Sequence, residues 1–111
     1  MSDQQLDLKT RSALLELKQA LHVMYRDRLQ GLYLYGSCAR GTAHQDSDVD
    51  ILIVLEGAVK TGAEISRMNP IISDICLRHD LLISTFPVST EWRQIHGNPF
   101  FENVRKEAVP V

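Results

Sequence analysis

The segment from Asp48 to Leu55 reads DVDILIVL and carries the strongest structural signal in the chain. Its apolar, β-branched residues predict a strand. Two shorter apolar runs predict further strands, one over 32–35 and one over 81–86, the second closed by Pro87. Between and around these runs the pattern is helical. The sequence therefore predicts strands that alternate with helices.

Four helical regions are predicted, one of them short. Leucines at helical spacing, with Leu15 widening the apolar stripe, predict an amphipathic helix over about 4–28. A second helix is expected over about 63–78, with a kink or a fresh start at Pro70. After a short helix that follows Ser89, Asn98 and Pro99 open a last helix to about residue 108. Strands and helices in this order predict an α+β (α/β two-layer) domain.

The length and composition narrow the function classes. A chain of 111 residues without repeats or linker-like stretches fits one domain over residues 1–111. A net charge of −2 gives no electrostatic argument for direct nucleic-acid binding. We find no apolar run long enough for a membrane helix, and the start MSDQQLD does not resemble a signal peptide. Cys38 and Cys76 suggest neither a disulfide framework nor a zinc site, so we expect a cytoplasmic protein.

Asp48 and Asp50 form the first candidate site. Residues two apart in a strand project from the same face, so both carboxylates should lie side by side. Two neighbouring carboxylates repel one another unless a cation neutralises them. Mg²⁺ is commonly held by one or two carboxylates, while substrate phosphates and water complete its coordination. The pair therefore predicts a magnesium site at the start of this strand.

A second motif, Gly36-Ser37, follows the predicted strand over 32–35. Glycine allows a tight turn and close approach of a ligand to the backbone, and Ser37 at the start of a helical turn offers a hydroxyl near free N–H groups. Arg40 could add a positive charge toward phosphates. Each motif alone is often structural, and Asp46 is most simply a loop residue. Together, the four fixed positions would match by chance on the order of once per thousand chains of this length. The pair predicts a Mg²⁺-nucleotide site for phosphoryl or nucleotidyl transfer.

The two motifs closely resemble the signature of the DNA polymerase β-type nucleotidyltransferases, here LYGSCARG followed by SDVDILIV. The small size is similar to that of the minimal nucleotidyltransferases, which are antitoxin partners of HEPN-domain toxins. The resemblance implies a polymerase β-like fold, with a small mixed sheet and helices packed on one side. It also implies Mg²⁺-dependent transfer of AMP from ATP, in which Gly36 and Ser37 hold the triphosphate and Asp48 and Asp50 hold the metal. The implied acceptor is a partner protein's hydroxyl, a tyrosine of a HEPN toxin.

Members of this fold usually supply a third carboxylate from a later strand, as a metal ligand or as an aid in deprotonating the acceptor. Asp80, in the segment HDLLI, is the best candidate for this catalytic and metal-binding role. It fits a helix-to-strand turn equally well. Ser84 and Thr85 cannot replace a carboxylate as a base or a strong metal ligand.

Three functions remain open from the sequence. The leading hypothesis is an antitoxin enzyme that adenylylates its toxin. The second is an antitoxin that neutralises its toxin by binding alone. The third is the catalytic subunit of a small-molecule or RNA nucleotidyltransferase. Since one domain of this size leaves little room for an acceptor site, we expect the acceptor to come from a partner.

Overall fold

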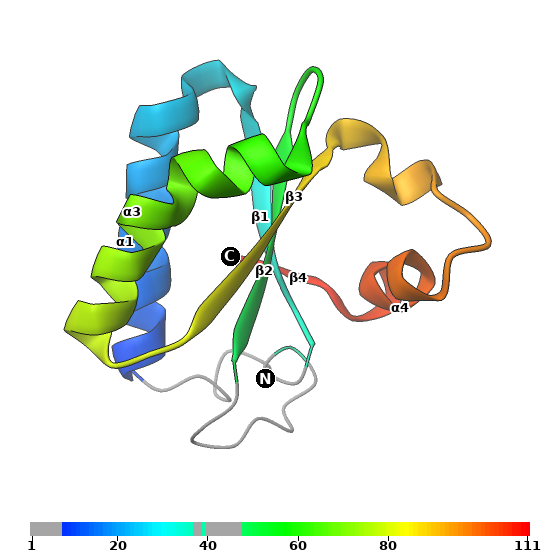
Figure 1. The fold of residues 1–111 in the computed structure, drawn as a ribbon. Coiled ribbons are helices and arrows are strands. Elements are labelled where there is room, and N and C mark those ends of the chain that lie inside the picture. The colour runs from blue at the N-terminus through cyan, green and yellow to red at the C-terminus, as the bar shows by residue number, and fades with distance from the viewer. Residues whose placement is uncertain (1–7, 37–38, 40–47) are drawn as a thin grey trace.

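The structure is a computed structural model that describes residues 8–36, 39 and 48–111. Within these residues, four strands form one mixed sheet in the order β3-β2-β1-β4 (Figure 1). The strands are β1 (Leu29–Tyr35), β2 (Val49–Leu55), β3 (Ile83–Ser89) and β4 (Val109–Pro110). β1 runs antiparallel to both β2 and β4, whereas β2 and β3 are parallel. The long apolar strand predicted from the sequence is thus an inner strand of the sheet.

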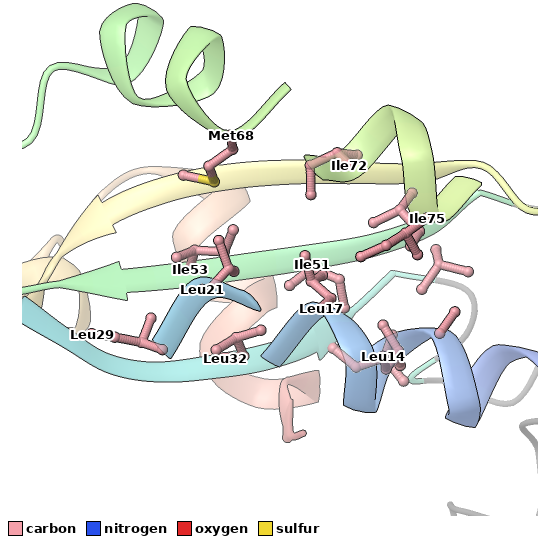
Figure 2. Packing of buried hydrophobic residues seen from close by; sticks show 14 of the residues in the cluster. Leu14, Leu17, Leu21, Leu29, Leu32, Ile51, Ile53, Met68, Ile72 and Ile75 are labelled. Carbon is pink, nitrogen blue, oxygen red and sulfur yellow. The ribbon is translucent and has the colours of Figure 1, made fainter. Parts of the chain in front are cut away.

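Two long helices, α1 (Leu8–Tyr25) and α3 (Thr61–His79), lie together on one face of the sheet (Figure 1). The apolar stripe of α1 and the inward side of α3 meet alternate residues of β2 there (Figure 2). The buried residues that form this cluster include Leu14, Leu17, Leu21, Ile51, Ile53, Met68, Ile72 and Ile75. Burial of these side chains is the main source of stability on this face.

The opposite face carries a smaller cluster. The short 3-10 helix η3 (Thr90–Gln94) and the helix α4 (Pro99–Glu107) cover this face. Trp92 of η3 and Val104 of α4 pack with Leu52 and Val54 of β2. A further short turn, η2 (Arg26–Arg28), joins α1 to β1. The predicted α+β, two-layer fold class with a small mixed sheet is confirmed. The two long helices lie on one side as expected, and the short C-terminal helix adds cover on the other face.

Several predicted boundaries differ from the structure. β3 does not stop before Pro87 but continues to Ser89, because β3 is an edge strand and Pro87 can lack an N–H there without breaking the ladder. α3 continues through Pro70 as one helix without a fresh start, and its axis bends along its length (Figure 1), as the kink alternative predicted. Leu15 is 60% exposed and does not widen the apolar stripe of α1. The strand β4 was not predicted, since two residues give no pattern. None of the described helices is long and apolar enough to cross a membrane.

Candidate nucleotide and metal site

Three of the predicted site residues that the structure describes, Gly36, Asp48 and Asp50, lie at one edge of the sheet. β1 ends at Tyr35, followed by Gly36, while β2 begins at Val49, directly after Asp48. Because β1 and β2 are antiparallel, the end of the first lies beside the start of the second. β3 is parallel to β2 and therefore also begins at this edge. The topology thus brings together segments that are separated by more than ten residues in the sequence.

Asp48 and Asp50 project toward the face covered by α4. Val49 and Ile51 are buried in the cluster under α1 and α3, so the alternation of the strand turns the two aspartates to the opposite face. Asp48 is exposed and Asp50 is half-buried. The prediction that both carboxylates share one face is therefore met by the register of β2.

Gly36 is fitted tightly against Asp50. Its φ of +77° lies in the left-handed region, which side-chain-bearing residues rarely adopt. A Cβ placed on Gly36 would lie 2.4 Å from Asp50 Oδ2, closer than real Cβ contacts. Glycine is therefore required both by the turn and by the carboxylate beside it.

The neighbours of Asp50 in the sheet are Tyr35 on β1 and Ser84 on β3, each directly opposite in register. Side chains of directly paired residues lie on the same face, so all three face α4. Burial, and secondarily the negative charge of Asp50, raises the pKa of the Tyr35 phenol to about 12. Tyr35 is therefore a neutral, partly buried phenol at physiological pH, and Ser84 is the β3 residue next to the Asp50 carboxylate.

Asp80 lies where the chain turns from α3 toward β3. It ends the helix with a left-handed φ of 54°, and its backbone carbonyl accepts a hydrogen bond from Lys9 Nζ at 3.2 Å. In the described part of the chain, no group of three His, Cys, Asp or Glu side chains is arranged to hold a metal ion. The helix-to-strand turn that the sequence offered as an alternative is present, and the role of Asp80 as third carboxylate stays a prediction.

Two of the predicted phosphate-binding residues, Ser37 and Arg40, lie outside the described residues. Ala39 is described, and it packs against the cluster under α1 and α3. Ala39 therefore lies on the α1/α3 side of the sheet, whereas the two carboxylates face the α4 side.

The donor set fits a magnesium ion. Asp48 and Asp50 offer carboxylate oxygens from one face at the start of β2, and the missing side chain of Gly36 lets the Asp50 carboxylate lie against the turn. Mg²⁺ prefers oxygen ligands and accepts one or two carboxylates with phosphates and water in its remaining positions. The described residues thus supply the protein share of such a site.

An aromatic cluster borders the carboxylates and was not predicted from the sequence, where Phe100 and Phe101 suggested only a core or an interface. The Phe100 ring lies 5.6 Å from the Tyr35 ring and 5.4 Å from the Phe86 ring, centroid to centroid. Phe101 stacks on Phe86 at 6.1 Å. Phe100 is nevertheless 38% exposed. No short-range pattern could have placed a residue of α4 next to the end of β1.

Comparison with known proteins now identifies the class of protein to which this site and fold belong. The model of the nucleotidyltransferase domain family matches residues 14–108, and the chain belongs to that family. The family assignment agrees with the resemblance seen in the two motifs, and it makes this protein a nucleotidyltransferase.

Two proteins of similar sequence come from Methanocaldococcus jannaschii. The protein named "Putative protein adenylyltransferase MJ0141" is 36% identical over 69 residues, which is 62% of this chain and 69% of that protein. "Putative protein adenylyltransferase MJ0604" is 48% identical over 42 residues, which is 38% of this chain and 42% of that protein. The fold is similar to a chain in a crystal structure described as "the toxin-antitoxin with AMP-PNP", with 22% identity and a TM-score of 0.56, covering 85% of this chain and 68% of that one.

Proposed function

We propose that this chain transfers AMP from ATP to a hydroxyl group of a partner protein, with Mg²⁺ held by Asp48 and Asp50. The observation that carries the proposal is the close fit of the Asp50 carboxylate against the Gly36 turn, at the edge where three strands meet. The choice of AMP and of a protein acceptor is supported by the names of both M. jannaschii relatives.

In the proposed reaction, the acceptor oxygen bonds to the α-phosphorus of ATP while the bond from that phosphorus to the bridging oxygen breaks. Pyrophosphate leaves with the electron pair of that bond, and the acceptor proton passes to a base. Gly36 lets the triphosphate approach the backbone, and Ser37 and Arg40 contact its phosphates. Asp80 is the proposed base. When bound, Mg²⁺ neutralises phosphate charge and orients the α-phosphate.

We further propose that the acceptor is a tyrosine of a HEPN-type toxin and that the chain acts as its antitoxin. A toxin-antitoxin with AMP-PNP has a similar fold, which supports testing a toxin as acceptor. A binding-only antitoxin remains the second candidate. It is favoured by one observation: in the part of the chain that the structure covers, Asp48 and Asp50 are joined by no third metal-binding side chain. The third candidate, a catalytic subunit acting on a small molecule or RNA, has no such support.

The test is intact-mass spectrometry of the partner protein, the product of the gene adjacent to the one for this chain. The two proteins are co-expressed and co-purified. We expect a mass increase of one or more AMP units that depends on ATP and Mg²⁺. Asp48→Asn and Asp50→Asn should abolish the increase while both proteins still co-purify. The matched control is Asp27→Asn, the same chemical change at an exposed site in η2, at the opposite end of β1.

Three outcomes separate the candidates. Modification lost in the two site variants and kept in the control supports the enzyme. An unmodified partner that is still fully neutralised supports the binding-only antitoxin and overturns AMP transfer to protein. Transfer to an antibiotic or to RNA without the partner supports the third candidate.

A further inference from the structure

The two strands that flank β2 place uncharged residues opposite Asp50. β1 pairs Tyr35 with Asp50, and β3 pairs Ser84 with it from the other side. Because directly paired residues share one face of a sheet, the Tyr35 and Ser84 side chains lie on the same face as the Asp50 carboxylate. This carboxylate therefore has a neutral neighbour at the paired position of each flanking strand.

The segment at the start of β3 also offers no charge. The backbone N–H of Val49 donates to the Leu82 carbonyl at 2.8 Å, which fixes this segment against the start of β2. Ile83 is buried in the cluster under α1 and α3, so its neighbours Leu82 and Ser84 turn to the face that carries the two carboxylates. Both side chains are exposed. Next to the carboxylates, this segment therefore presents one apolar side chain and one hydroxyl.

Asp80 does not occupy a position in this strand. It lies in the turn that ends α3, before β3 begins, and its backbone carbonyl is held by Lys9 of α1. Over the described ranges 8–36, 39 and 48–111, no three His, Cys, Asp or Glu side chains are grouped so that they could hold a metal ion. The described residues therefore bring two carboxylates, those of Asp48 and Asp50, to the candidate metal site.

The number of carboxylates decides how tightly a site binds a divalent cation, because affinity follows the charge count of the ligands. Mg²⁺ gives up its water reluctantly and is usually held by one or two carboxylates together with substrate phosphates. A third carboxylate would raise the affinity for the ion, but without the ion it would be repelled by the other two. A neutral residue at position 84 avoids this repulsion and leaves most of the coordination to water and phosphates.

We infer that Ser84 sets the metal affinity of this site, so that the chain alone binds Mg²⁺ weakly and holds it firmly only together with the phosphates of the nucleotide. The inference rests on the proposed function and names the residue that makes metal binding depend on the nucleotide. The Ser84 hydroxyl offers a neutral oxygen at most. An aspartate at the same position would bring a third negative charge beside Asp50, since neighbouring strands lie about 4.8 Å apart.

The experiment measures Mn²⁺ binding without nucleotide, from the electron paramagnetic resonance signal of the free ion, for wild type and Ser84→Asp. Mn²⁺ favours the same oxygen ligands as Mg²⁺. Ser84→Asn controls for side-chain size without charge. Ser89→Asp is the matched control for charge: Ser89 ends the same strand at its far end, and Asp can still cap η3 there. The double variant Ser84→Asp with Asp50→Asn restores the count of two carboxylates.

We expect Ser84→Asp to bind Mn²⁺ about 10-fold more tightly than wild type, because the ligand charge count rises by one. Ser84→Asn, Ser89→Asp and the double variant should stay near the wild-type affinity. Circular dichroism checks that each variant is folded, and Ser84→Glu replaces Ser84→Asp if that variant is not. Equal affinities of wild type and the folded acidic variant would overturn the inference, and so would a double variant that keeps the full gain.

The dependence on the nucleotide is tested with AMP-PNP, whose affinity for wild type is measured with Mg²⁺ and in EDTA. Mg²⁺ should tighten AMP-PNP binding by a factor of about 5 to 150, the usual range for two coupled ligands. An AMP-PNP affinity that Mg²⁺ does not change would overturn the inference. None of these measurements uses an acceptor. If the binding results hold but wild type modifies no partner, the proposed function fails and the role of Ser84 in metal binding stands.

Discussion

Gly36 and Asp50 are fitted so closely that a single methyl group on Gly36 would lie 2.4 Å from Asp50 Oδ2. The carboxylate occupies the space that a side chain would need, and the turn has a positive φ as well. This contact ties the end of β1 to the start of β2 and fixes one oxygen of the proposed metal site. The pair therefore gives the sharpest test of the site geometry.

We predict that Gly36→Ala lowers the rate of AMP transfer about 100-fold, since displacing a reacting group by about 1 Å has an effect of that order. The free energy of unfolding should fall by about 1–2 kcal/mol from the left-handed backbone alone. Gly57→Ala is the matched control, because Gly57 also has a positive φ, of 89°, but nothing lies within 4 Å of its added Cβ. Urea unfolding and a transfer assay measure both effects. Equal losses of stability with full transfer in Gly36→Ala would contradict the prediction.

Asp80→Asn separates the two interpretations of that residue. Asn tolerates the left-handed conformation as Asp does, so the variant keeps the turn and removes the carboxylate. If Asp80 is the third carboxylate, transfer should fall by about 10²-fold or more, the range of general acid–base catalysis, with little change in melting temperature. Transfer at the level of the Asp27→Asn control would show that Asp80 only ends the helix.

The sequence was sufficient for the parts of the site that depend on local pattern. The β-branched run predicted β2, alternation placed Asp48 and Asp50 on one face, and the glycine after an apolar strand predicted the turn at Gly36. Each of these depends on residues within a few positions of one another. The α+β fold class followed from the order of such segments.

The remaining features depend on pairing between distant segments. Ser84 faces Asp50 only because β2 and β3 are parallel in one particular register. Pro87 fits inside β3 only because that strand is at the edge of the sheet. The contact of Phe100 with Tyr35 joins residues 65 positions apart, and no periodicity in either segment encodes it.

Tyr25→Phe should destabilise the fold without affecting transfer. The Tyr25 hydroxyl donates to the buried Glu64 carboxylate at 2.7 Å, and Arg28 lies 3.8 Å from the same carboxylate. Hydrogen bonds to charged groups contribute about 1.5–3 kcal/mol, so we expect a loss in that range on urea unfolding. Tyr25 ends α1 at the sheet end opposite Gly36, which is why transfer should be retained.

The control for this variant is Tyr33→Phe, since the Tyr33 hydroxyl makes no hydrogen bond to another of the described residues. It should lose little stability. The pKa of Tyr25 is raised to about 12, first by burial and then by its hydrogen bond to Glu64. Because the pKa of the Tyr25 phenol is higher in the folded than in the unfolded state, the neutral phenol stabilises the fold below about pH 10. This contribution to stability is lost as the pH rises toward 12. Equal alkaline unfolding curves for wild type and Tyr25→Phe would contradict this assignment.

Acid stability should depend on Glu16. Arg78 and His79 of α3 hydrogen-bond to the Glu16 carboxylate of α1 and lower its pKa to about 2 from 4.5. A depressed carboxyl pKa contributes stability that is present above about pH 4.5 and is lost as the pH falls toward 2. Melting temperatures over this range should fall less steeply in Glu16→Gln than in wild type.

Arg78→Gln breaks the same contact from the other helix and leaves the Glu16 carboxylate in place. The melting temperature of this variant should therefore also fall less steeply with decreasing pH than that of wild type. The three melting curves are compared at low and at high salt, because an exposed ion pair is screened by salt. If the melting temperatures of wild type and both variants fall equally steeply below pH 4.5, the contact contributes nothing to the acid dependence of stability.

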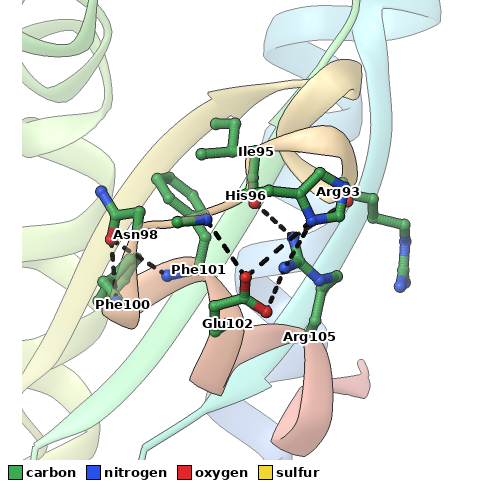
Figure 3. A network of polar contacts seen from close by, with 9 residues as sticks. Arg93, Ile95, His96, Asn98, Phe100, Phe101, Glu102 and Arg105 are labelled. Carbon is green, nitrogen blue, oxygen red and sulfur yellow. Dashed lines mark hydrogen bonds and ion pairs between the residues drawn. The ribbon is translucent and has the colours of Figure 1, made fainter.

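Arg105→Gln tests the polar contacts that join the segment 93–98 to α4 (Figure 3). Arg105 Nη1 donates to the Ile95 carbonyl at 2.7 Å and to the Arg93 carbonyl at 3.0 Å, so its loss should release the segment that precedes α4. We expect trypsin to cut after Arg93 several times faster, because the backbone around Arg93 is no longer held against α4. Lys106→Gln is the control, because it removes a neighbouring exposed cation and also one trypsin site but leaves the Arg105 contacts with Arg93, Ile95 and Glu102 in place. Cleavage after Arg93 at the rate of the Lys106→Gln control would show that the Arg105 contacts do not hold this segment.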